Sequence, residues 1–114
     1  MEALFAKLRE YLQMDDEIPF VEFSAYYRDV LAEFMANYKA YDKENLIKAT
    51  AITTVVAANA IDRGKAKDIN AKKYKKMAEK LSFWAEAISL RLEKEYGLSK
   101  NDVDKEIDAL LADV

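Results

Sequence analysis

The chain has neither cysteine nor histidine among its 114 residues. Without cysteine it can form no disulfide framework, no zinc–thiolate site and no cysteine nucleophile. Without histidine it lacks the commonest general base and metal ligand, and the only side chain whose ordinary titration lies near neutral pH. Helical-bundle di-iron sites built on Glu-x-x-His pairs are excluded for the same reason.

Carboxylates are the only abundant reactive groups that remain. Serine, threonine and lysine nucleophiles need an activating base or a desolvated pocket, and no spacing in the chain indicates either. Asp15, Asp16 and Glu17 form one acidic cluster that could hold a divalent cation loosely, but a solvated cluster at the start of a helix explains them better. We therefore predict a non-enzymatic protein with no catalytic residues, no metal and no organic cofactor.

Glycine and proline are scarce, with two glycines and one proline in the whole chain. This leaves little material for long loops, β-hairpins or a glycine-rich phosphate-binding loop. Hydrophobic residues make up 52% of the sequence, enough for a core without disulfides or metals at this length. We expect one domain, residues 1–114, that is almost entirely helical.

Long apolar runs are missing as well. The longest weakly polar stretch, residues 49–61, contains Asn59 and three threonines and falls short of the roughly 20 residues of a membrane-spanning helix. The first residues include acids and no small-residue cleavage site, unlike a signal peptide. The sequence predicts a cytoplasmic protein with no membrane contact.

The most apolar segment, residues 45–62, organises the predicted fold. Placed on a helix, its large side chains point in all directions. A helix that is hydrophobic all round must be covered on most sides, so we place this segment at the centre of a bundle, where its alanines let neighbouring helices come close. The large side chains are Leu46, Ile47, Ile52, Val55, Val56 and Ile61.

A β-strand is the alternative for this segment, because Ile52 to Val56 is an unbroken β-branched run. Length favours the helix. Asp42 is a good N-cap and Gly64 stands where a helix would end, and the roughly twenty residues between them are too many for an ordinary strand.

The predicted fold is an all-α, compact bundle of about five helices. Along the second helix, the aromatic and aliphatic residues from Phe20 to Tyr41 follow the i, i+3, i+4 spacing of a buried face, while Ala25, Ala32 and Ala36 mark a side that a second helix could approach. Gly97 predicts a sharp helix ending, and Ser99 predicts a cap for the next helix. Three long antiparallel helices are expected at 19–41, 43–62 and 70–96, and two short ones at 2–13 and 100–112.

Charge is segregated along the chain in a way that the net charge of −3 hides. Residues 63–80 hold eight bases and two acids, whereas residues 1–46 hold ten acids and five bases. Lysines act as point charges suited to backbone phosphates, so the basic segment is a candidate contact for nucleic acid or another polyanion. A merely solvated helix face is the simpler alternative. The candidate residues are Arg63, Lys65, Lys67, Lys72, Lys73, Lys75 and Lys76.

A second candidate surface lies on the helix expected at 70–96. Phe83, Ala87 and Leu90 fall within about 60° of one another, opposite the stripe that carries Trp84 and Ile88. They form either a protein interface or a face covered by the first or last helix. An interaction or assembly protein, with a protein partner or as a homo-oligomer, is the function that the sequence favours, and polyanion contact is the alternative.

Overall fold

The computed structural model describes residues 1–114 and is all-α, as the sequence predicts. It contains five α-helices and one short 3₁₀ helix, and no strand. The elements are α1 (Glu2–Leu12), α2 (Phe20–Asn37), η1 (Tyr38–Ala40), α3 (Lys43–Lys65), α4 (Ala71–Tyr96) and α5 (Lys100–Leu110). None of the helices is apolar over a length that could span a membrane.

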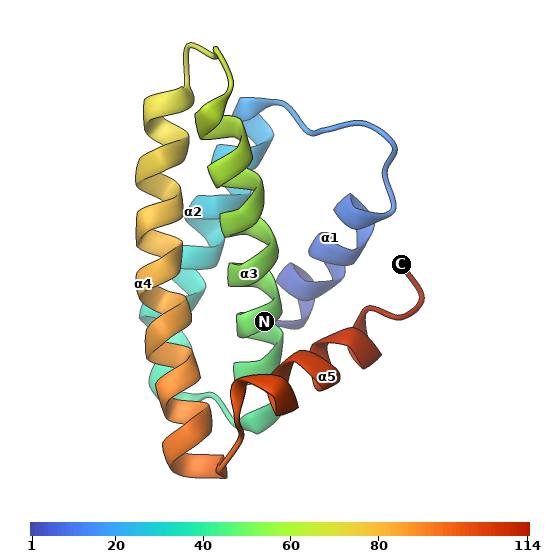
Figure 1. Cartoon of the computed structure of the whole chain (residues 1–114), viewed down its shortest axis with the longest axis vertical. Coiled ribbons are helices and arrows are strands. Elements are labelled where there is room, and N and C mark those ends of the chain that lie inside the picture. The colour runs from blue at the N-terminus through green and yellow to red at the C-terminus, as the bar shows by residue number, and fades with distance from the viewer.

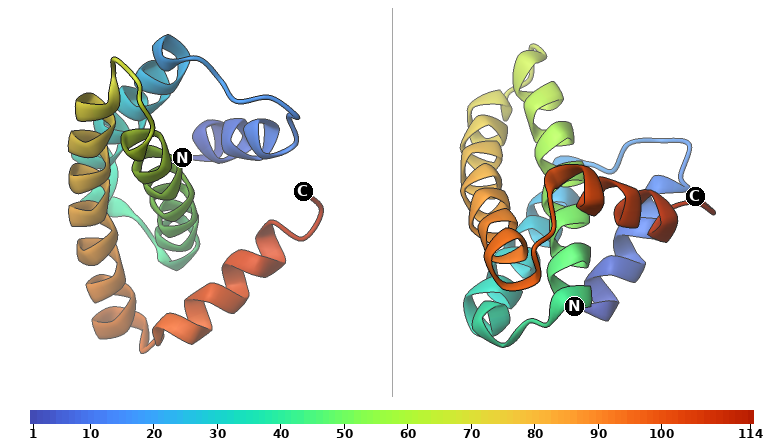
Figure 2. Two further views of the ribbon diagram at one scale, coloured as in Figure 1. Left: turned by 45° about the horizontal axis from the view of Figure 1, so that its top comes forward. Right: turned by 60° about the horizontal axis from the view of Figure 1, so that its bottom comes forward.

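The three long helices run antiparallel to one another in chain order, as predicted, and α1 and α5 lie on the side of α3 away from α4 (Figure 1). The α5 helix turns away from the end of α4 and crosses toward α1, so that the two short helices approach each other at their C-terminal ends beside α3 (Figure 2). The α3 helix therefore lies between α4 on one side and α1 and α5 on the other.

The α3 helix is the centre of the core. Ten of its 23 residues are buried, more than in any other helix. Leu46 and Ile52 are completely buried, and Val56 is nearly so. The strand alternative for Ile52 to Val56 is thus wrong, because the whole run lies inside one helix whose Asp42 cap accepts a hydrogen bond from the Asn45 backbone N–H at 2.9 Å.

Gly64 does not end this helix, contrary to the prediction. The helix continues to Lys65, and Gly64 is buried within its last turn. A Cβ atom on Gly64 would lie 2.9 Å from Cγ of Lys75 and 3.5 Å from the carbonyl oxygen of Ala71. Gly64 therefore allows α3 and α4 to approach closely, and the chain reverses direction only after Lys65.

The α2 helix packs through large aromatic rings. Phe23 meets Tyr74 with ring centroids 5.2 Å apart, and Phe34 meets Trp84 at 5.4 Å, which confirms the predicted aromatic core stripe. The small-residue side of α2 is not covered by a second helix along its length, because Ala32 and Ala36 are exposed, whereas Ala25 is half-buried. Regular α-helix also ends at Asn37, so Tyr38 to Ala40 form the 3₁₀ turn of η1.

The predicted ending of α4 and start of α5 are confirmed. Gly97 adopts a left-handed conformation with φ of 64°, and the backbone N–H of Leu98 donates to the carbonyl oxygen of Leu92, as in a Schellman ending. Ser99 and Asp102 then form a reciprocal capping box. The α5 segment packs through Val103, which is buried, and through Ile107, Leu110 and Leu111, which are partly buried, whereas Val114 is exposed.

Three arginines donate hydrogen bonds to backbone carbonyl oxygens of segments that lie far away in the chain. Arg91 of α4 donates to the carbonyl oxygens of Tyr38 and Tyr41, at the α2–α3 connection. Arg9 of α1 donates to the carbonyl oxygen of Leu110, at the end of α5. Arg63 of α3 binds the α1–α2 connection in the same way, because a planar guanidinium can serve several acceptors at once.

We predict that Arg91→Lys lowers the free energy of unfolding by about 1–2 kcal/mol, because an ammonium group cannot reach both carbonyl oxygens and one part-buried acceptor loses its partner. Chemical denaturation measures this. Arg28→Lys is the matched control, since Arg28 contacts only Ser24 of its own helix and the change should be nearly neutral. Equal effects of the two substitutions would contradict the role given to Arg91.

Candidate interaction surfaces

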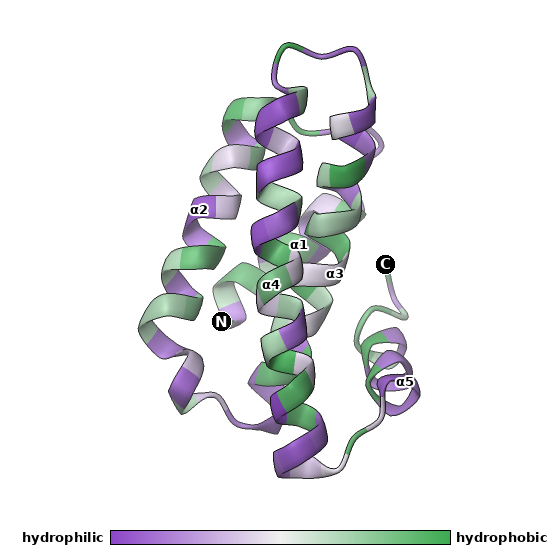
Figure 3. Cartoon of the chain, turned by 60° about the vertical axis from the view of Figure 1, so that its left-hand side comes forward, coloured by the Kyte–Doolittle hydropathy of each residue, from purple (hydrophilic) through white to green (hydrophobic).

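The structure brings the lysines of the basic segment together around the α3–α4 connection. Lys65 ends α3, Lys67 lies in the connection, and the other four lie in the first two turns of α4. All six are exposed, and none forms a salt bridge. Seen from outside, α4 is mostly hydrophilic in these first turns and shows more hydrophobic residues further along (Figure 3). The six are Lys65, Lys67, Lys72, Lys73, Lys75 and Lys76.

Arg63, the seventh candidate residue for polyanion contact, forms its contacts within the protein. Its Nη1 donates to the carbonyl oxygen of Ile18 at 2.8 Å and to the hydroxyl of Tyr74 at 3.0 Å. The guanidinium also stacks over the ring of Phe23, 4.6 Å from the centroid. Its charge is thus held at the α1–α2 connection and is not displayed with the lysines.

The apolar strip formed by Phe83, Ala87 and Leu90 is exposed on α4 at Phe83 and Leu90, whereas Ala87 is half-buried. Phe83 is 63% exposed and Leu90 is 50% exposed. The alternative that α1 or α5 folds over this face is wrong, because both helices lie on the far side of α3 (Figure 2). Ile61 of α3 is also exposed and shares a shallow hollow with Phe83, so the apolar surface extends from α4 toward α3.

Opposite charges flank this strip. Glu79, Glu86 and Glu93 are spaced by seven residues, which places them along one edge of the strip, and Lys80 lies on the opposite edge. All four are exposed, and none forms a salt bridge within the chain. A surface with an apolar centre and unpaired charges at its edges has the layout of a protein interface.

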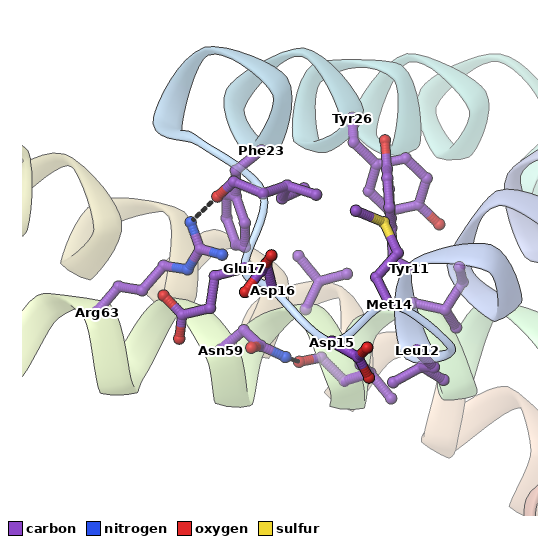
Figure 4. Close-up of a pocket in the computed structure, with 14 residues that line it drawn as sticks. Tyr11, Leu12, Met14, Asp15, Asp16, Glu17, Phe23, Tyr26, Asn59 and Arg63 are labelled. Carbon is purple, nitrogen blue, oxygen red and sulfur yellow. Dashed lines mark hydrogen bonds between the residues drawn. The ribbon is translucent and has the colours of Figure 1, made fainter. Parts of the chain in front are cut away.

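A cavity of about 260 Å³ lies between α1, the α1–α2 connection, the start of α2 and α3 (Figure 4). Its walls are mainly apolar, and the exposed side chains of Asp15, Asp16 and Glu17 line its mouth. Sequence reasoning missed it because its walls come from four separate segments. The apolar and aromatic lining includes Leu8, Tyr11, Phe23, Tyr26, Val55 and Val56.

The two tyrosines that line the cavity show how buried its interior is and which charges surround it. Tyr26 donates its hydroxyl hydrogen to the carbonyl oxygen of Leu4 at 2.7 Å, and burial raises its pKa well above the ordinary range. The pKa of Tyr11 is also raised, first by burial and then by the negative charges of Glu22, Glu10 and Asp29. Lys7, which lies over the Tyr11 ring at 5.3 Å, is paired with Glu10. Negative charge therefore predominates around an apolar interior.

The acidic cluster at the cavity mouth does not assemble a metal site. The carboxylates of Asp15, Asp16 and Glu17 point in different directions (Figure 4), and no group of three acidic side chains in the chain could hold a metal ion. The cluster therefore does not form the loose cation site that its sequence offered.

No protein-family model, curated protein or solved structure matches the chain.

We predict that Phe83→Glu leaves the fold intact and shifts the melting temperature by only a few degrees, because surface substitutions usually change stability by no more than about 0.5 kcal/mol. Thermal melting followed by circular dichroism measures this. Leu81→Glu, two residues earlier on the same helix, is the matched control: Leu81 is completely buried, and an unpaired charge there should unfold the protein. Unfolding by Phe83→Glu would show that the strip is internal.

Proposed function

We propose that the protein is a non-enzymatic interaction module that binds a helix of a protein partner through the outer face of α4. The exposure of Phe83 and Leu90 is the observation that carries this proposal. These two side chains would be buried only if another helix of the chain lay over them, and none does. An apolar strip presented by a rigid helix is suited to receive the apolar face of a second helix.

The charges on either side of the strip indicate which charged residues a partner helix would carry. A helix lying along the strip would gain from basic side chains toward Glu79, Glu86 and Glu93 and from an acidic one toward Lys80. The shallow hollow beside Phe83 offers room for one of the partner's apolar side chains. We therefore expect an amphipathic helix with an apolar stripe and a basic edge.

A photoreactive phenylalanine analogue at position 83 tests this proposal in cells of the native host. We expect covalent adducts with one or a few proteins, because the reactive ring would lie inside the interface. The same analogue in place of Lys105, an exposed residue of α5, is the control and should give none of these adducts. The addition of Leu90→Glu should abolish them, and identical adduct patterns at positions 83 and 105 would refute the proposal.

A second candidate function, polyanion contact, is supported by the six unpaired lysines around the α3–α4 connection. Lysines that are exposed, clustered and free of intramolecular salt bridges keep their full charge for an external phosphate chain. Binding would follow the phosphate backbone and would not depend on base sequence, because lysine ammonium groups do not read base edges in a fixed geometry.

We predict salt-sensitive binding of duplex DNA, with the logarithm of the association constant falling by about 0.9 per neutralised phosphate for each unit of log salt concentration. A variant with Lys72, Lys73, Lys75 and Lys76 changed to Gln should bind more weakly and with a shallower slope. Fluorescence anisotropy at several salt concentrations measures both. Lys100→Gln with Lys105→Gln, on α5, is the control, and equal binding by all three proteins would exclude a specific role for the segment.

A further inference from the structure

The connection between α3 and α4 holds an apolar side chain almost entirely in solvent. Ile69 is 97% exposed, more than any other large hydrophobic residue of the chain. The turn that carries it is closed by its own hydrogen bonds: the Asp68 N–H donates to the Ala66 carbonyl oxygen at 2.9 Å, and the Asp68 carboxylate accepts from the Asn70 N–H at 2.6 Å. Ile69 thus lies on a turn closed by hydrogen bonds, and its side chain takes no part in the core.

Positive charge surrounds this apolar tip. Lys65 and Lys67 precede Ile69, and Lys72 and Lys73 follow it within four residues. All four are exposed and none forms a salt bridge, although Lys73 lies over the ring of Phe20 at 5.4 Å. Asp68 is the only acid of the connection, and its carboxylate already accepts a hydrogen bond within the turn. We call residues 65–73, with Ile69 at the apex, the basic tip.

The cavity beside α1 has the opposite character. Its interior is apolar, its mouth carries the carboxylates of Asp15, Asp16 and Glu17, and none of these three forms a salt bridge. The one base in its wall, Arg63, is already bound to Ile18 and Tyr74. An apolar side chain carried on a positively charged segment is complementary to this cavity in both polarity and charge.

The basic tip and the cavity lie at the same end of the molecule. Arg63 lines the cavity and the tip begins two residues later. Glu17 of the cavity mouth also lines an adjoining small hollow together with Ala66 and Asp68. One two-fold axis at this end can therefore bring the tip of each copy to the cavity of the other, which gives a closed dimer with two equivalent contacts.

We propose that the cavity receives Ile69 of a second copy of this chain, and that the lysines of the basic tip pair with the acidic mouth. In the resulting dimer, the basic tip of each copy contacts the cavity of the other copy. This contact uses neither Phe83 nor Leu90, so it goes beyond the partner binding proposed for α4 and is tested separately from it. It shares Lys65, Lys67, Lys72 and Lys73 with the candidate polyanion contact. Electrostatic attraction between tip and mouth makes the association sensitive to salt.

Sedimentation velocity over a range of protein concentrations at low salt tests the apolar half of the contact. The wild-type chain should form a dimer, and Ile69→Ser should lower its association constant at least tenfold without changing the melting temperature. Met35→Ser is the matched control, because Met35 is also highly exposed, at 76%, but lies near the other end of α2. Phe83→Glu should retain the dimer, which separates this contact from the strip on α4.

A charge exchange tests the polar half. Asp15→Lys with Asp16→Lys reverses the mouth, and Lys67→Glu with Lys72→Glu reverses the tip. Each double variant alone should be monomeric, since like charges then face each other. An equimolar mixture should dimerise, because the reversed mouth meets the reversed tip and the two unaltered surfaces meet in the second contact. Circular dichroism checks that both variants are folded.

Four results would overturn the proposal. The first is a wild-type chain that stays monomeric at every concentration. The second is a dimer that Ile69→Ser leaves unchanged, and the third is a mixture of the two charge variants that stays monomeric. The fourth is growth beyond two chains, which would show that tip and cavity do not close around a two-fold axis.

Discussion

The need to cover residues 46–53 of α3 on nearly every side determines the arrangement of the other helices. Small residues such as Ala60 and Gly64 let α4 approach at close range, whereas aromatic side chains fill the space toward α2. The two short helices close the third side. Because all of them face α3, their outer surfaces have no helix of the chain left to cover them. The exposure of Phe83 and Leu90 is thus a consequence of how the core is built.

Arginine and lysine have separate roles in this fold. Three of the four arginines bind backbone carbonyl oxygens of distant connections, which anchors the α1–α2 connection, the α2–α3 connection and the end of α5. A forked planar donor suits that task, and a flexible ammonium group does not. Most lysines stay at the surface, and those of residues 65–80 form no salt bridge, although Lys73 lies over the ring of Phe20 at 5.4 Å. The positive field of the protein is consequently concentrated at one end of α3 and α4.

The proposed functions depend on the shape and charge of surfaces that a scaffold of five helices displays. The strip on α4 combines apolar side chains with charged edges, and the cavity beside α1 combines an apolar interior with an acidic mouth. The basic tip supplies the charge and the apolar side chain that such a mouth would attract. The strip and the basic tip are carried by a helix and by a hydrogen-bonded turn, so little ordering entropy opposes binding at either surface.

The sequence by itself determined the features that depend on neighbouring residues: the helix periodicity, the Asp42 cap, the capping box at Ser99 and the left-handed Gly97. These are set by contacts within one or two helical turns. Only the tertiary structure decided that Gly64 lies inside a helix contact, that Arg63 binds Ile18, 45 residues away in the chain, and that four segments enclose a cavity. Those outcomes depend on the direction and distance at which helices pack, and residue spacing along one helix carries no information about either.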